Sequence, residues 1–102
     1  MSQDTMKLVQ IYYHFEFAEA IERILDRQGI ENYLRHSRVA GRDREGKHFG
    51  TKIYPGSASM AQAQVPAEGV APLLEALRDF QQAEASHQHL SAVVLPVEEL
   101  LA

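Results

Sequence analysis

The order in which helical and strand-like patterns alternate restricts the fold of this chain more than any other feature of its sequence. Between residues 17 and 29, apolar residues recur at helical spacing, and Gly29 stands where a helix C-cap is expected. A second helical pattern covers residues 66–85, and we expect its Pro72 in the first turn, where a missing N–H costs no hydrogen bond. The apolar positions are Phe17, Ile21, Ile24 and Leu25 in the first helix and Val70, Leu73, Leu74, Leu77 and Phe80 in the second.

Runs rich in β-branched and aromatic residues flank these two patterns, and their composition favours strands. They cover residues 7–15, 30–40, 51–65 and 92–97. Pro55-Gly56 predicts a turn or bulge in the first half of the third run, because proline cannot donate to a strand ladder. The order β-α-β-β-α-β predicts an α+β, ferredoxin-like fold, in which a four-stranded antiparallel sheet has two helices on one face.

The length of 102 residues and the apolar content of 45% fit a single domain. We expect residues 1–5 to be a flexible tail and residues 6–102 to form the domain, with a glycine-bounded flexible connection at 41–50. The sequence contains no run of about 18 apolar residues and no signal-peptide pattern, so we expect a cytoplasmic protein. The absence of Cys excludes disulfides and thiolate catalysis.

The strands are apolar on both faces, although the two helices can cover only one. In the first strand, Val9, Ile11 and Tyr13 lie on one side and Leu8 and Tyr12 on the other. The last strand, AVVLPV, is apolar on both sides as well. Apolar residues on an uncovered sheet face indicate another layer, and a chain this short has no further element to supply it. The pattern therefore predicts self-association.

Residues 35–52 concentrate positive charge on an acidic chain. They hold six of the ten Lys and Arg residues and carry a local charge of +4, whereas the whole chain carries −4 and the remainder therefore −8. Guanidinium groups bind phosphate or carboxylate through paired hydrogen bonds, and glycines let backbone N–H groups approach a ligand. The stretch predicts a confined anion site or, alternatively, a charged hairpin that protects a strand edge. The candidate ligand-binding residues are Arg35, Arg38, Gly41, Arg42, Arg44, Lys47 and His48.

The histidines offer a second candidate site, for a metal ion. His87 and His89 are two residues apart, so an extended segment would place both rings on one side. Imidazole is a good ligand for Zn or Cu, and a chain without Cys has only His and carboxylates as strong ligands. His36 and His48 converge if the second and third strands pair tightly. The alternative is that His87 and His89 are solvent-exposed residues of a polar connection.

Catalytic patterns are weak in this sequence. Glu98 and Glu99 are adjacent at the end of the last strand, so their side chains point to opposite faces and cannot act as an acid–base pair. No nucleophile elbow occurs. The net charge of −4 argues against nucleic acid and anionic membranes as partners. We expect a binding protein rather than an enzyme, with no nucleic-acid partner and no membrane insertion.

Several short motifs resemble the superfamily of PII signalling proteins and CutA proteins. They are KLVQIYY, the helix end at Gly29, the glycine-bounded loop, IYPG and AVVLPVEEL. This resemblance implies a homotrimer with the sheets facing inward and an adenine nucleotide or a small anion bound in the cleft between subunits. It also implies that residues 41–50 correspond to the PII T-loop, with Arg38 and Gly41 at its near base.

The function implied by the resemblance is that of a trimeric regulatory protein. It would sense a small anionic ligand, such as a nucleotide or bicarbonate, and signal through the 41–50 loop to a partner protein, either a membrane transporter or an enzyme. The loop has no tyrosine, and EASHQHLS lacks the glycines and basic residues of the PII B-loop, which argues against ATP-type binding. The alternative is a CutA-like protein that binds metal ions through its His residues. Such a protein would act in metal tolerance or would regulate a metal transporter.

Overall fold

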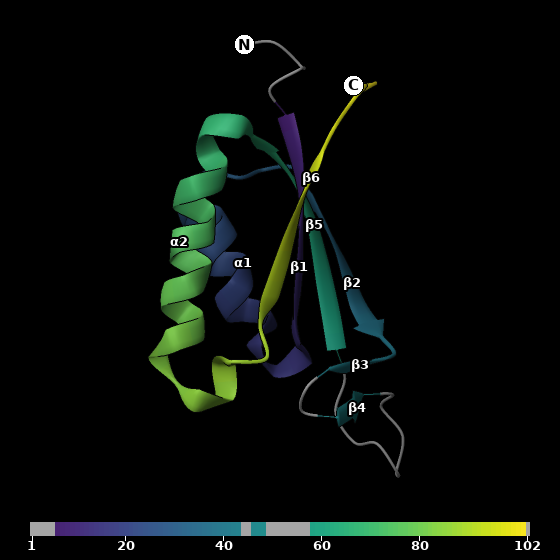
Figure 1. Cartoon of the computed structure of the whole chain (residues 1–102), viewed down its shortest axis with the longest axis vertical. Helices are drawn as coiled ribbons and strands as arrows, with labels where there is room; N and C mark the ends of the chain where they lie inside the picture. Colours follow the sequence, from purple (N-terminus) through teal and green to yellow (C-terminus); the bar gives the residue numbers. More distant parts are fainter. Residues whose placement is uncertain (1–5, 44–45, 49–57, 102) are drawn as a thin grey trace.

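The computed structural model describes residues 6–43, 46–48 and 58–101, and Figure 1 shows how its elements are arranged. The expected tail at 1–5 and the Pro55-Gly56 turn lie outside the described residues. Within those ranges, no helix is long and apolar enough to cross a membrane. The elements are β1 (Met6–His14), η2 (Phe15–Phe17), α1 (Ala18–Arg27), β2 (Tyr33–Val39), β3 (Gly41–Asp43), β4 (Gly46–His48), β5 (Ala58–Pro66), α2 (Ala67–Ala83), η3 (Ala85–His87) and β6 (Ser91–Pro96).

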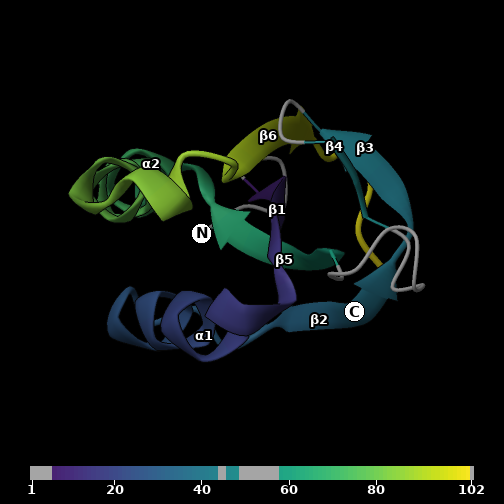
Figure 2. The same cartoon turned by 90° about the horizontal axis from the view of Figure 1, so that it is seen from below.

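The main sheet is antiparallel and has the spatial order β2-β5-β1-β6. Its central pair, β1 and β5, runs in register from Met6 opposite Pro66 to His14 opposite Ala58. Both α1 and α2 lie on one side of this sheet, as Figures 1 and 2 show from two directions. The structure therefore confirms the α+β, ferredoxin-like fold that the sequence predicts.

Alternation along the strands decides which side chains meet the helices. In β1, Val9, Ile11 and Tyr13 are fully buried, and the residues between them are partly exposed. Each fully buried Val, Leu or Ile side chain contributes roughly 1.5–3 kcal/mol. The buried apolar residues between the sheet and the helices form one hydrophobic core, and its burial is the main stabilising contribution to the fold. Its members include Val9, Ile11, Tyr13, Ile21, Leu25, Ala61, Ala63, Val65, Leu73 and Leu77.

Gly29 ends α1 as the sequence predicts. Its φ of 72° lies in the left-handed region that favours glycine. The N–H of Gly29 donates to the carbonyl of Asp26, and the N–H of Ile30 donates to the carbonyl of Leu25, both at 3.0 Å. These two bonds form a Schellman motif, which satisfies carbonyls at the helix end and turns the chain toward β2.

The position of Pro72 within α2 differs from the prediction. The helix begins at Ala67, directly after the extended Pro66, so Pro72 lies five positions further on and beyond the first turn. It therefore lacks the N–H that would donate to the carbonyl of Glu68. Both Pro72 and Glu68 are exposed, so water can hydrogen-bond to that carbonyl. The prediction was wrong because the helix start is set by the end of β5 and not by Pro72.

The sheet face opposite the helices, here called the open face, carries apolar residues among glutamines. The register places Leu8 opposite Gln64 and Leu95, and Gln10 opposite Gln62 and Val93, so these side chains share a face. Leu34 and His36 of β2 join the same face opposite Gln62 and Met60. The structure confirms that Leu8 and Tyr12 lie on the face opposite to Val9, Ile11 and Tyr13. The open face consists of Leu8, Gln10, Tyr12, Leu34, His36, Met60, Gln62, Gln64, Val93 and Leu95.

Candidate functional site

The basic stretch forms a small hairpin at the end of the main sheet. The pairing of β2 with β5 shifts register between His36 and Val39, and the chain then continues into β3, which pairs with β4. Gly46 begins β4 with a φ of 124°, a conformation that L side chains rarely adopt. The sequence predicts a flexible connection at 41–50, whereas the described part of that segment is paired strand. Figure 1 shows β3 and β4 beyond the lower ends of β2 and β5, and Figure 2 shows them on the side away from the helices.

The hairpin brings two predicted site residues together. Arg42 lies directly opposite Lys47, and both residues are exposed. Residues that face each other across an antiparallel pair have Cβ atoms about 4.5–5.5 Å apart. Arginine and lysine side chains that face each other in this way can both donate charge-assisted hydrogen bonds to one anion.

The remaining predicted anion-site residues lie at different places. Arg38 is exposed on β2, before the hairpin, and Gly41 is the first residue of β3, opposite His48. The side chain of His48 and the whole of Arg44 lie outside the described residues. Apart from Arg35, the described members of the predicted site thus lie between β2 and the β3–β4 hairpin.

Arg35 has a partner elsewhere. It lies opposite Ala61, whose side chain is buried under the helices, and its guanidinium forms an ion pair and a hydrogen bond with the Glu22 carboxylate of α1. This pair ties β2 to α1. Because both side chains are partly exposed, such a pair contributes about 0–1 kcal/mol. The structure therefore places Arg35 on the helix side of the sheet, apart from the hairpin.

Two tyrosines adjoin the Arg35–Glu22 pair. Burial raises the pKa of Tyr13 above its ordinary value, and the Glu22 carboxylate raises it further. Burial and Glu22 also raise the pKa of Tyr33. Within the described part of the chain, the buried Tyr13 hydroxyl has no hydrogen-bond partner. Tyr13 is thus a polar group held under the helices at a cost in stability.

Ser59 positions the base of the hairpin, although the sequence reasoning did not single it out. Its side chain is fully buried, and its hydroxyl donates to the carbonyl of Ser37 at 2.7 Å, within the register shift of β2. The bond joins β5 to β2 where ladder pairing is interrupted. A lone serine in the otherwise apolar buried positions of β5 was the signal available in the sequence.

His87 and His89 are buried rather than solvent-exposed, and they do not lie in an extended segment. His87 ends η3, and its Nδ1 donates to the carbonyl of Phe80 at 2.8 Å. The Nε2 of His89 accepts the backbone N–H of His14 at 2.9 Å, so its Nδ1 carries the proton and donates to the carbonyl of Ser86. His14 also stacks on His89 with ring centroids 3.5 Å apart. These contacts hold the 84–90 segment against the end of β1.

The predicted metal ligands do not form a cluster in the described ranges. No group of three or more His, Asp and Glu residues there could hold a metal ion. β2 pairs with β5, so His36 lies opposite Met60 and 3.4 Å from the amide oxygen of Gln62. Both ring nitrogens of His89 take part in hydrogen bonds, and a metal would have to displace one of them. Zn or Cu binding stays a prediction.

No protein-family model and no curated protein match the sequence. Solved structures with the same fold do match it. CPII from Thiomonas intermedia K12, a nitrogen regulatory PII-like protein bound to ADP, AMP and bicarbonate, is 26% identical with a TM-score of 0.73, over 90% of this chain and 91% of that one.

Two further structures share the fold at 18% identity. One is a protein from Thermus thermophilus assigned to PII-like signalling, with a TM-score of 0.66 over 90% of this chain and 86% of that one. The other is a DUF3240 family protein from Shewanella baltica, with a TM-score of 0.68 over 100% and 98%. The likeness to CPII supports the predicted resemblance to small, divergent PII-like proteins, and all three structures show that this chain shares their fold.

Proposed function

We propose that the chain is a homotrimeric regulatory protein and not an enzyme. It senses a small anionic ligand, an adenine nucleotide or a bicarbonate-like anion, in the cleft between subunits. It then signals to a partner protein, a transporter or an enzyme, through the 41–50 loop, which contains the β3–β4 hairpin. The observation that carries this proposal is the cross-strand pair of Arg42 and Lys47 on a hairpin that projects from the sheet.

The open face supports the oligomer. Leu34, Val93 and Leu95 are exposed large apolar side chains, and they lie together with glutamines on the face that no helix covers. A second layer from other copies of the chain would remove this surface from water. Threefold symmetry comes from the resemblance to PII proteins.

The hairpin supports ligand sensing. CPII, the PII-like neighbour at 26% identity, was solved with ADP, AMP and bicarbonate bound. Residues 84–91 of this chain contain no Lys or Arg. The negative charge of a bound phosphate or bicarbonate would therefore be neutralised by Arg38, Arg42 and Lys47. Arg42 and Lys47 lie on the projecting hairpin, so an anion drawn between them would change the segment that a partner protein meets.

The test is calorimetric titration of the purified protein with ADP, AMP and bicarbonate. We expect Arg42→Ala and Arg38→Ala each to weaken binding by about 1.5–3 kcal/mol, the range for hydrogen bonds to charged groups. Arg78→Ala is the matched control, because Arg78 is an exposed arginine on the opposite, helical side. Equal affinity in wild type and both site variants would remove the hairpin from the binding site. Titration with Zn²⁺ and Cu²⁺ in parallel tests the CutA-like alternative.

A further inference from the structure

The outer surface of the helical layer carries two arginines that the proposed site does not use. Arg23 and Arg27 lie one helical turn apart on α1 and are exposed. Within residues 6–43, 46–48 and 58–101, neither guanidinium has an ion pair or a side-chain hydrogen bond. Arg35, by contrast, is paired with Glu22. Like charges at this helical spacing repel each other, so the pair favours a bound anion.

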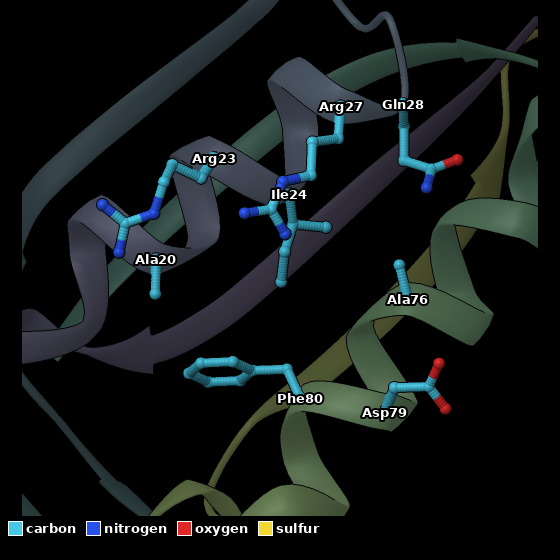
Figure 3. A pocket seen from close by; sticks show the side chains of 8 residues that line it. All are labelled: Ala20, Arg23, Ile24, Arg27, Gln28, Ala76, Asp79 and Phe80. Atoms are coloured by element: carbon cyan, nitrogen blue, oxygen red, sulfur yellow. The ribbon is translucent and has the colours of Figure 1, made fainter.

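These arginines line an open pocket of about 500 Å³ between α1 and α2. Figure 3 shows both of their side chains on the α1 side, while Phe80 and Asp79 leave α2 in opposite directions. The volume falls in the range of small-molecule sites. The residues that line the pocket are Ala20, Arg23, Ile24, Arg27, Gln28, Ala76, Asp79 and Phe80.

The pocket lining divides into three chemical parts. Arg23, Arg27 and the Gln28 amide supply hydrogen-bond donors along α1. Ile24, which is buried, and Phe80, which is half-buried against Phe17, supply apolar surface between the helices. Asp79 on α2 would repel a second negative group. A ligand that satisfies all three has one anionic end and an uncharged, apolar body.

We propose that the groove between α1 and α2 is a second binding site, for a small organic monoanion with an apolar or aromatic body. Arg23 and Arg27 hold the carboxylate or phosphate end, and Ile24 and Phe80 contact the apolar part. The site lies within one subunit, on the opposite side of the sheet from β3 and β4. It does not depend on the proposed anion site or on the trimer.

Benzoate is the probe, with acetate and benzyl alcohol as partial probes that lack the aromatic ring and the charge, respectively. Backbone amide shifts in a two-dimensional NMR titration report both the site and the affinity. We expect benzoate to shift the amides of residues 20–28 and 76–80 and to bind more tightly than either partial probe. Benzoate shifts confined to other residues, or equal affinity for all three compounds, would overturn the proposal.

Matched variants separate this groove from the hairpin. We expect Arg23→Ala and Arg27→Ala each to weaken benzoate binding by up to about tenfold, the loss of one charge-assisted hydrogen bond at an exposed site. Arg23→Lys should keep part of the affinity, because it keeps the charge. Arg78→Ala, at an exposed arginine of α2 outside the groove lining, should leave benzoate binding unchanged. Unchanged affinity in both groove variants, with their circular dichroism intact, would contradict the proposal and leave the ADP and bicarbonate results unaffected.

Discussion

The two faces of the four-stranded sheet differ in how much apolar surface the chain itself covers. On the helix side Val9, Ile11 and Val65 are 0% exposed, whereas on the open face Leu34 is 68% and Val93 53% exposed. Both faces come from the same alternation in the same strands. The comparison teaches that one chain covers only one of two apolar sheet faces, and the proposed oligomer would cover the other.

The largest effect is expected from charges on the open face. Val93→Lys combined with Leu95→Lys should convert the proposed oligomer to monomer, because burying two ammonium groups in an apolar interface is unfavourable. Far-UV circular dichroism should stay the same, and sedimentation velocity measures the change in mass. Gln82→Lys with Ala83→Lys, two charges on an exposed part of α2, is the control. If the wild-type protein were monomeric at micromolar concentration, the open face would not be covered by other copies of the chain, and the proposed oligomer would be wrong.

A truncation under the helices should have the next largest effect. Ile11→Ala removes a fully buried side chain and should lower the free energy of unfolding by about 2–5 kcal/mol, through lost burial and a residual cavity. Guanidinium denaturation measures this loss. Leu34→Ala, made in the monomeric Val93→Lys, Leu95→Lys background, should change stability by no more than about 0.5 kcal/mol. Similar losses at the two positions would show that the open face is already covered within one chain.

Tyr13 is a buried polar residue on the covered face whose hydroxyl has no hydrogen-bond partner among the described residues, and deleting that hydroxyl should stabilise the protein. Tyr13→Phe keeps the ring and deletes a buried hydroxyl without a partner in the described residues, so we expect a gain of about 1–3 kcal/mol. Thermal or chemical denaturation at neutral pH measures it. A loss of stability would mean that the hydroxyl has a partner, such as a bound water molecule.

The same residue predicts a pH dependence. The pKa of Tyr13 is raised by burial above its ordinary value of 10.0. As the pH rises past that value, the unfolded chain loses the proton while the folded chain keeps it, so the free energy of unfolding falls. Tyr13→Phe should therefore lose less stability than wild type in alkaline solution. Parallel decline of the two proteins would contradict this assignment.

The smallest effect is expected at the Arg35–Glu22 pair, at the partly exposed margin of the covered face. Glu22→Ala should change the free energy of unfolding by no more than about 1 kcal/mol, and high salt should reduce the difference further. Urea denaturation at two salt concentrations measures both. Affinity for ADP and bicarbonate should not change. A gain in affinity would indicate that a released Arg35 can join the hairpin site.

Local pattern in the sequence determined the elements and the face that each strand residue takes. Helical spacing located α1, Gly29 located its end, and alternation separated Val9 and Ile11 from Leu8. These features depend on neighbours within a few residues, which the sequence displays directly. The start of α2 could not be predicted in this way. Proline is well suited to the first turn of a helix, which favours a start near Pro72, but the extended Pro66 ends β5 and the helix begins at Ala67.

Only the tertiary structure decided what the charged and histidine side chains do. The sequence located the basic stretch, but the register of β3 on β4 placed Arg42 opposite Lys47, and the packing of α1 on β2 engaged Arg35 with Glu22. Likewise, the position of the 84–90 segment at the end of β1 buried His89. Charge and polarity are properties of single residues, whereas a side chain's partner depends on strand register and helix docking between segments far apart in the chain.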